Sequence, residues 1–353
     1  MAYPQVERQK SFKVGIVGAG GYTGSELARL LALHPDVELR FATSEKHQGK
    51  KLSDLHPHAL DRVDLTLISA EEACGEKTDL VFLALPHGVS QNYAARFLDM
   101  GCRVIDLSGD FRLPDGALYE QWYGKAHQQE ALLKEAVFGL PELFRNEIRN
   151  ARLVANPGCY PTSAILGLAP LLKAELIDPR DIIIDSKSGV TGAGITPGDT
   201  THFPRVTDNF SAYGLMRHRH TPEIEIALRQ LYGHTPRVQF TPHLLPVDRG
   251  ILTTIYARPL RAVSNEEVRE LFARFYFSEH FVRMSVKPPE IKQVRGSNYC
   301  DLYPVYDERT NRIMVISVID NLVKGAAGQA IQNMNIIFRL IENSGLRQLP
   351  IYP

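Results

Sequence analysis

The stretch of sequence that decides the fold runs from Phe12 to Gly24 and reads FKVGIVGAGGYTG. Its first six residues are mostly apolar, which predicts a short buried strand, and Ser25–Leu33 carries leucines at helical spacing. The glycines lie between these two elements. A strand, a glycine-rich turn and a helix in this order are typical of a dinucleotide-binding α/β unit, where the helix N-terminus faces phosphate.

The alternation of strands and helices continues through the first half of the chain. Strands are predicted at residues 37–42, 79–85 and 103–107, with a helix at 89–100 between the last two. Strands joined by helices in this way favour a parallel, doubly wound sheet.

The pattern changes after residue 154. Fewer helices separate the later apolar stretches, which lie at residues 182–184, 238–244, 251–256, 281–286 and 313–319. This favours a mixed or antiparallel second sheet. A final helix, predicted at residues 326–341, is expected to pack back onto the first domain.

We therefore predict an α/β protein with a Rossmann-like parallel-sheet domain and an α+β catalytic domain built on a mixed sheet. The expected boundaries are residues 1–157 for the dinucleotide-binding domain and 158–324 for the second domain. The returning C-terminal helix is expected within residues 325–345.

Composition excludes several classes of partner. The 353 residues hold 40 Lys and Arg against 40 Asp and Glu, so the balanced charge argues against nucleic acid or an anionic membrane surface as partner. The polar residues 1–11 and the lack of a long apolar run predict a cytoplasmic protein without a membrane segment. Four scattered cysteines predict neither a disulfide framework nor a metal site.

The residues after the second strand bear on the choice of cofactor. Thr43 and Ser44 stand where an NAD enzyme often has an acidic residue for the ribose diol, and Lys46 follows, which favours the 2′-phosphate of NADP. Glu45 leaves a ribose contact open as the alternative. After the third strand, His87 either lines the cofactor cleft or caps the next helix.

One cysteine has the setting of a nucleophile. Cys159 lies in the turn NPGCYPT, residues 156–162, just before a helix expected from Thr162, whose hydroxyl would cap it. A helix N-terminus lowers a thiol pKa and favours the reactive thiolate. The alternative is a small buried thiol at a packed junction. The other three cysteines are expected to be buried or incidental.

Two histidines are the candidate acid and base. His218 and His220 precede Thr221, which is expected to cap a helix, so an extended chain would point both imidazoles the same way. Imidazole titrates near neutral pH, as proton transfer to an acyl group requires. A solvated basic loop is the alternative. A metal hydrolase is excluded because the two histidines lack a third ligand at metal spacing.

Two further loops complete the predicted site. Residues 186–194, SKSGVTGAG, offer hydroxyls and backbone amides able to hold phosphate oxygens or an oxyanion, with a flexible connection as the alternative. Arg112 follows the fourth strand and could pair with a substrate carboxylate or form a structural salt bridge.

Five motifs together resemble the N-acetyl-gamma-glutamyl-phosphate reductase family, within the aspartate-semialdehyde-dehydrogenase-like group. They cover nearly the whole chain, and the cysteine and His-Arg-His motifs are specific. The motifs are the glycine turn 18–24, PGCYPT at 157–162, SGVTGAG at 188–194, HRHTPEI at 218–224 and DNLVKGAAG at 320–328.

The resemblance implies reduction of N-acetyl-L-glutamyl 5-phosphate to N-acetyl-L-glutamate 5-semialdehyde with NADPH and release of phosphate, a step of arginine biosynthesis. Cys159 would carry the acyl group as a thioester, and His218 or His220 would serve as acid and base. Asn321 would contact the nicotinamide. The second sheet would provide the interface of a homodimer or homotetramer.

The residues and the resemblance together assign three sets of site residues. Catalysis is assigned to Cys159, His218 and His220. Cofactor binding is assigned to Gly18, Gly20, Gly21, Tyr22, Thr23, Gly24, Thr43, Ser44, Pro86, His87, Ser188, Gly189 and Asn321. Binding of the acyl phosphate is assigned to Arg112, Asn156, Ser188 and Arg217.

The chain departs from the family pattern at Ile195, where a basic residue is common. If that residue holds phosphate, the candidates to replace it are Arg205, Arg217 and Lys187.

Three other functions remain as alternatives. Reduction of an N-acetyl-aminoadipyl phosphate in lysine biosynthesis differs by one methylene, and the Pro-Thr pair after the cysteine favours the arginine branch. A dehydrogenase of aspartyl phosphate or a phosphosugar aldehyde is disfavoured by the His-Arg-His motif. A catalytically silent NADP-binding regulator is disfavoured by the intact cysteine and histidines.

Overall fold

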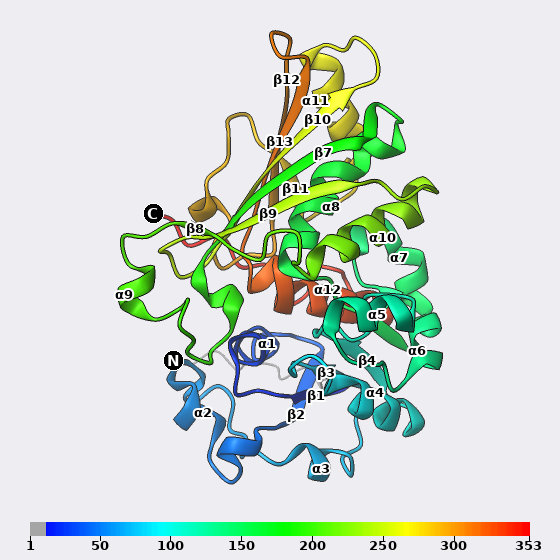
Figure 1. Ribbon diagram of the computed structural model, residues 1–353. Coiled ribbons are helices and arrows are strands. Elements are labelled where there is room, and N and C mark those ends of the chain that lie inside the picture. The colour runs from blue at the N-terminus through cyan, green and yellow to red at the C-terminus, as the bar shows by residue number, and fades with distance from the viewer. Residues whose placement is uncertain (1–11) are drawn as a thin grey trace.

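The computed structural model describes residues 12–353, so the expectation for residues 1–11 lies outside it. A parallel sheet and a mixed sheet each carry their own helices, and the chain returns to the first sheet at its end (Figure 1). The predicted pairing of a parallel with a mixed sheet is confirmed.

The first sheet has six parallel strands in the order β2-β1-β3-β4-β6-β5. All four residues of β3 are buried, because their side chains alternate between two covered faces. The strands are β1 Phe12–Val17, β2 Val37–Ala42, β3 Leu80–Leu83, β4 Arg103–Asp106, β5 Val137–Phe138 and β6 Leu153–Ala155.

Helices cover both faces of this sheet. Helices α1 and α12, Gly328–Ile337, pack on the face of Val14 and Ile16, whereas α3 and α4 pack on the face of Val81 and Leu83. The helices of this half are α1 Tyr22–Leu31, α2 Leu52–Leu55, α3 Ala70–Ala73, α4 Ser90–Asp99, α5 Gly116–Tyr123, α6 Glu130–Glu135 and α7 Pro141–Asn150.

The second sheet is mixed, with the strand order β11-β12-β13-β10-β7-β9-β8. Pairs β11·β12 and β7·β9 are parallel and the others are antiparallel. The strands are β7 Ile177–Ser188, β8 Ser211–Ala212, β9 Val238–Leu244, β10 Ile251–Pro259, β11 Val282–Met284, β12 Cys300–Asp307 and β13 Arg312–Ile319.

Helices cover one face of the second sheet. Along β10 buried residues such as Ile255 alternate with half-buried ones such as Thr254 and Tyr256, and α8 packs against the buried set. The helices of this half are α8 Cys159–Lys173, α9 Phe203–Val206, α10 His220–Tyr232 and α11 Asn265–Phe275.

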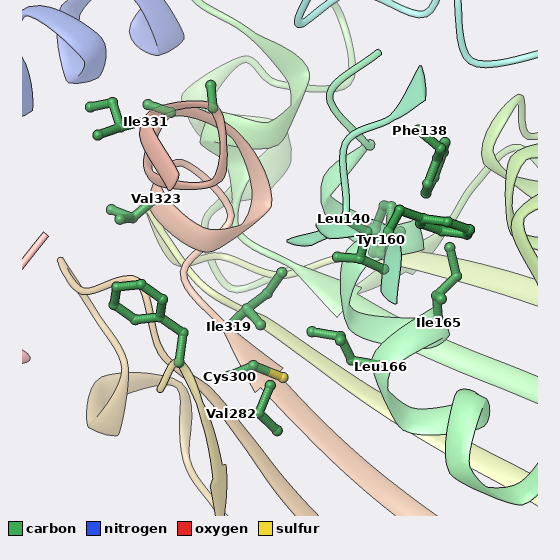
Figure 2. Close-up of a cluster of buried hydrophobic side chains, with 14 of the residues drawn as sticks. Phe138, Leu140, Tyr160, Ile165, Leu166, Val282, Cys300, Ile319, Val323 and Ile331 are labelled. Atoms are coloured by element: carbon green, nitrogen blue, oxygen red, sulfur yellow. The ribbon is translucent and has the colours of Figure 1, made fainter. Parts of the chain in front are cut away.

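The core between α8 and this sheet encloses one of the four cysteines. Figure 2 shows Cys300 near Leu166, Val282 and Ile319, and its side chain is fully buried. Burial raises the pKa of the Cys300 thiol to about 12. Cys300 is therefore a packing residue, as predicted.

Strand β12 and the last helix differ from the prediction, and the short strands β5, β6 and β8 were not predicted. Strand β12 was missed because its sequence CDLYPVYD breaks the apolar pattern with Asp301 and Pro304. The last helix was predicted at 326–341, but a π-helical turn, Val323–Ala327, precedes a shorter α12, Gly328–Ile337. As expected, α12 packs back on the first half of the chain, against α1 and α7.

No helix within residues 12–353 combines the length and the apolar character needed to cross a membrane.

A buried ion pair joins the returning segment to the first half. The Nζ atom of Lys324 donates to Glu142 Oε1 at 2.7 Å and to Gln332 Oε1 at 2.9 Å. Both charged side chains are fully buried. Burial alone would raise the pKa of Glu142, but Lys324 and Gln332 lower it, so the carboxylate stays charged.

Removing the lysine should leave an uncompensated buried charge. We expect Lys324→Met to lower the free energy of unfolding by about 3–5 kcal/mol in chemical denaturation. The double variant Lys324→Met/Glu142→Leu should regain most of this loss. The matched control is Lys51→Met, which breaks the exposed pair with Asp64 and should change stability little. Equal effects of the two single variants would refute a structural role for the buried pair.

Candidate active site

The glycine turn between β1 and α1 has the shape of a phosphate cradle. Gly18 has a φ of +96°, and a Cβ there would strike the backbone of Ala84, as a Cβ on Gly24 would strike that of Gly18. Nothing lies within 4 Å of a Cβ placed on Gly21, which caps α1, and the first turn of α1 holds no acidic residue. Open space over a helix N-terminus fits the pyrophosphate of a dinucleotide.

The residues after β2 divide into supporting and cleft-lining groups. Thr43 is buried, and its Oγ1 accepts from the Gly18 N–H at 3.1 Å, so it braces the turn instead of facing a ligand as predicted. Glu45 belongs to both groups, because its Oε1 accepts from the Ala70 N–H at 2.8 Å and the exposed residue also lines the cleft. Ser44 and the exposed Lys46 line the cleft, and within residues 12–353 the Lys46 side chain makes no hydrogen bond or ion pair.

Two clefts meet beside Cys159. The first, of about 520 Å³, runs from the glycine turn to Cys159. The second, of about 660 Å³, lies against the mixed sheet. Residues that line both clefts mark the junction, and they are His87, Cys159, Gly192 and His220.

Cys159 is the first residue of α8, with Gly158 as its N-cap. The helix begins three residues earlier than predicted. Thr162 is therefore no cap: its Oγ1 donates to the Gly158 carbonyl at 3.0 Å, within the first turn, and accepts from Gln329. The helix N-terminus thus lies directly at the cysteine, whose side chain is half-buried.

The pKa of Cys159 is raised, whereas the sequence predicted that the helix N-terminus would lower it. Burial raises it to about 11, and the nearby Tyr160 N–H and Arg112 charge offset this only in part. Loss of hydration therefore outweighs the helix terminus in the free protein. The group is a neutral thiol at neutral pH and needs a base to become a nucleophile.

His220 is placed to be that base. It is the first residue of α10, and Arg219 before it has helical angles of −59° and −20°, so the chain is not extended here as predicted. A Cβ on Gly158 would strike His220 Nε2, which places this nitrogen directly over the turn that carries Cys159. Burial, and then the charges of His218 and Arg112, hold the pKa of His220 well below 6.5, so the ring is neutral.

His218 lies farther into the second cleft. Its Nδ1 accepts from the His220 N–H at 3.2 Å, and its ring packs edge-on against Tyr160, Tyr213 and Phe240. It lines the second cleft and not the first. Burial and Arg219 lower its pKa to about 4. The sequence could not decide between the two histidines as acid and base. In the structure they occupy different places, because His220 lines both clefts and His218 lines only the second.

Glu223 is a buried residue that the sequence did not assign to the site. Its Oε1 accepts from the Gly158 N–H at 2.6 Å, and its Oε2 lies 3.4 Å from Arg112 and 4.0 Å from His220 Nε2. The available signal was its spacing of three residues from His220, which puts both on one helix face.

Arg112 and Asn156 form hydrogen bonds with backbone and side-chain groups next to the site. Arg112 donates to the carbonyls of Asn156 and Leu107, each at 2.8 Å. The Asn156 amide donates to Ala326, and its oxygen accepts from Asn333. Arg112 also forms a buried salt bridge with Glu223, and both Arg112 and Asn156 line the first cleft, so their contacts to substrate stay predictions.

The remaining predicted residues distribute between the two clefts. Ser188 and Gly189 line the second cleft, not the first as a cofactor contact would require. Asn321 lines the first, but its amide bridges Thr191 and Gly250. The first cleft is also lined by the other residues predicted to bind the cofactor, which are Gly18, Gly20, Gly21, Tyr22, Thr23, Gly24, Pro86 and His87.

Of the candidates to replace a basic residue at Ile195, only Arg217 lines a cleft. It is exposed in the second cleft. Lys187 instead pairs with Asp185 at 2.8 Å, and Arg205 lies outside both clefts. Throughout residues 12–353, no three His, Cys, Asp or Glu side chains gather to hold a metal ion.

Comparison with known proteins places this geometry in a family. Residues 13–151 match the NAD binding domain of semialdehyde dehydrogenases, and residues 159–321 match their dimerisation domain. The chain belongs to the semialdehyde dehydrogenase family. It is 52% identical over 349 residues to the N-acetyl-gamma-glutamyl-phosphate reductase of Symbiobacterium thermophilum, covering 97% of this chain and all of that protein. The reductase of Dehalococcoides mccartyi is 51% identical over 345 residues, covering 98% and 100%.

Solved structures share the fold at low identity. Aspartate semialdehyde dehydrogenase II from Vibrio cholerae superposes with a TM-score of 0.73 at 18% identity, covering 94% of this chain and 99% of that one. The aspartate semialdehyde dehydrogenase from Candida albicans, solved with NADP, gives 0.68 at 17%, covering 93% and 99%. The predicted fold class and family resemblance are confirmed.

The raised pKa of Cys159 can be tested by alkylation of the free protein. Because only the thiolate reacts, we expect the iodoacetamide rate at Cys159 to rise about tenfold per pH unit from pH 7 to 9.5, without a plateau. Mass spectrometry of the labelled peptide gives the rate, and Cys159→Ser gives the background from Cys74. A plateau below pH 8 would show a thiolate stabilised by the helix N-terminus instead.

Proposed function

We propose that the protein reduces N-acetyl-L-glutamyl 5-phosphate to N-acetyl-L-glutamate 5-semialdehyde with NADPH, releasing phosphate, as a step of arginine biosynthesis. The observation that carries this proposal is the position of Cys159 at the junction of two clefts, in a chain about half identical along its length to reductases of that name. The cytoplasmic location expected from the sequence remains part of the proposal.

The first cleft is proposed to bind NADPH. Ser44, Glu45 and Lys46 all line the cleft at the end of β2, but one carboxylate oxygen of Glu45, the competing ribose ligand, accepts from the Ala70 N–H. This arrangement supports a 2′-phosphate over a bare ribose diol. The NADP solved with the Candida albicans structure supports the same choice. When bound, NADPH supplies the hydride.

Cys159 and His220 are proposed to carry the covalent chemistry. His220 takes the proton from Sγ, the sulfur attacks the acyl carbon, and the carbon–oxygen bond to phosphate breaks, leaving a thioester. After reduction of the carbonyl carbon, the carbon–sulfur bond breaks, the aldehyde leaves, and His220 returns the proton to sulfur. The covalent link keeps the carbonyl at the junction throughout.

The second cleft is proposed to hold the acyl phosphate. Arg217 and Arg219 are both exposed cations in this cleft, and because Arg219 lies over the Tyr123 ring, Arg217 is proposed to take the phosphate. Ser188 and Gly189 border the same space. Glu223 and Arg112 keep the Gly158 turn in place beneath it. His218 is proposed to shape the cleft wall instead of moving the proton.

We also propose how the chain divides and assembles. Residues 1–157 form the cofactor-binding unit, and 158–324 form the catalytic and oligomerisation unit. The half-buried side of the second sheet, with Thr254 and Tyr256, is the proposed interface of a homodimer or homotetramer, since this segment matches a dimerisation domain.

The reverse reaction tests the function directly. We expect the protein to oxidise N-acetyl-glutamate semialdehyde when given phosphate and NADP⁺, with lower kcat/KM on the aminoadipate homologue and with NAD⁺. Cys159→Ser should lower kcat by about a thousandfold or more while NADPH still binds. Higher kcat/KM on the homologue would favour the lysine-pathway alternative. NADPH binding without turnover of either aldehyde would indicate a silent regulator.

The two histidines can be separated by matched substitutions. His220→Asn should lower kcat by about 10²–10⁴-fold through loss of the proton carrier, whereas His218→Asn should cost less than about tenfold. Because the pKa of His220 lies well below 6.5, wild-type kcat/KM should stay level as the pH falls to 6.5 and decline only at lower pH. The reverse ranking of the two variants would assign the proton transfer to His218.

A further inference from the structure

A third histidine lies at the junction of the clefts without a role in the chemistry described so far. His87 lines both clefts, together with Cys159 and His220. It stands on the turn after β3, in the first half of the chain, whereas the other two begin helices of the second half. His87 therefore reaches the junction from the first half of the chain.

The hydrogen bonds of His87 fix its tautomer. The Gly109 N–H donates to Nδ1 at 2.7 Å, so Nδ1 carries a lone pair and the proton of the neutral ring is on Nε2. Within residues 12–353, Nε2 makes no hydrogen bond to the protein. The ring thus presents a donor, and no acceptor, to the junction.

The surroundings of the ring keep it neutral. Tyr123 packs edge-on at 5.4 Å between ring centroids, and Arg219 lies over Tyr123 at 5.2 Å. Desolvation in the cleft, followed by the positive charges of Arg112 and Arg219, lowers the pKa of His87, although the residue remains exposed at its edge. His220, which also faces the junction, is neutral.

The turn that carries His87 is held at two points. Besides the bond from Gly109 to His87, the Gly88 N–H donates to Asp110 Oδ1 at 2.7 Å. Asp110 is itself buried and accepts from the Tyr119 hydroxyl at 2.9 Å. The donor is therefore positioned before any ligand binds, as stabilisation of developing charge requires.

We propose that His87 donates a hydrogen bond from Nε2 to the carbonyl oxygen of the acyl group on Cys159. This inference rests on the proposed function. The carbonyl must lie at the junction, because the acyl chain occupies one cleft and the hydride arrives from the other. The oxygen gains negative charge when sulfur attacks and again on reduction, so one donor stabilises both transition states.

Two substitutions separate the two nitrogens of the ring. In His87→Asn, the amide oxygen can still accept from Gly109 in place of Nδ1, but no donor reaches the position of Nε2. In His87→Gln, the amide N–H can reach that position, while the bond to Gly109 is lost. Turnover in both directions, the NADPH dissociation constant from fluorescence titration and the pH profile of kcat/KM are measured for each.

We expect His87→Asn to lower kcat about 10²–10³-fold with an unchanged NADPH dissociation constant and the wild-type pH profile. His87→Gln should recover at least about tenfold over His87→Asn. Wild-type kcat in both variants would overturn the inference. So would weaker NADPH binding with unchanged kcat at saturation, which would make His87 a cofactor ligand. Loss of one limb of the pH profile would make it an acid or base.

The wild-type protein in the same assay distinguishes failure of the proposed function from failure of the proposed role of His87. If it turns over N-acetyl-glutamate semialdehyde and the asparagine variant does so equally well, the role of His87 fails alone. If the wild type lacks turnover, the proposed function fails and the inference falls with it.

Discussion

The buried carboxylate of Glu223 holds the site together. It accepts a hydrogen bond from the backbone at Gly158, where α8 begins, and it belongs to the first turn of α10. Arg112, from the loop after β4, reaches it from the other half of the chain. One charged group thus ties together the cysteine, the histidine and the first sheet. Because each partner is buried, none can move away without leaving an unpaired charge or amide.

That arrangement explains why the cysteine is held as a thiol until a base takes its proton. Burial that excludes water raises the thiol pKa, and the same burial keeps His220 neutral. Two neutral groups side by side avoid the cost of a desolvated ion pair in the free protein.

Much of this architecture could be predicted from sequence, because the spacing of apolar residues and the positions of turn-forming residues are local properties of the chain. Strands β1, β2 and β9 were predicted with their observed bounds, and the glycine turn gave the cofactor cleft. The predictions were wrong where contacts between distant parts of the chain determine helix ends, pKa values and hydrogen-bond partners. Thr162 and Thr221 resemble caps, but the helices begin earlier because packing at Gly158 fixes their ends. The pKa of Cys159 depends on what buries it, and the partners of Asn156 and Asn321 lie far away in the chain.

The return of α12 to the first sheet has a consequence for how the protein forms during synthesis. The side chains of Val14 and Ile16 are buried partly by a helix that begins only at Gly328. Until the last segment has left the ribosome, this face of the first sheet is covered by α1 but not by α12, and Glu142 lacks its partner Lys324. The first half therefore cannot complete its folding before the second half is synthesised, although consecutive domains commonly fold in that order. The first sheet is therefore completely covered only after the C-terminal segment has been synthesised.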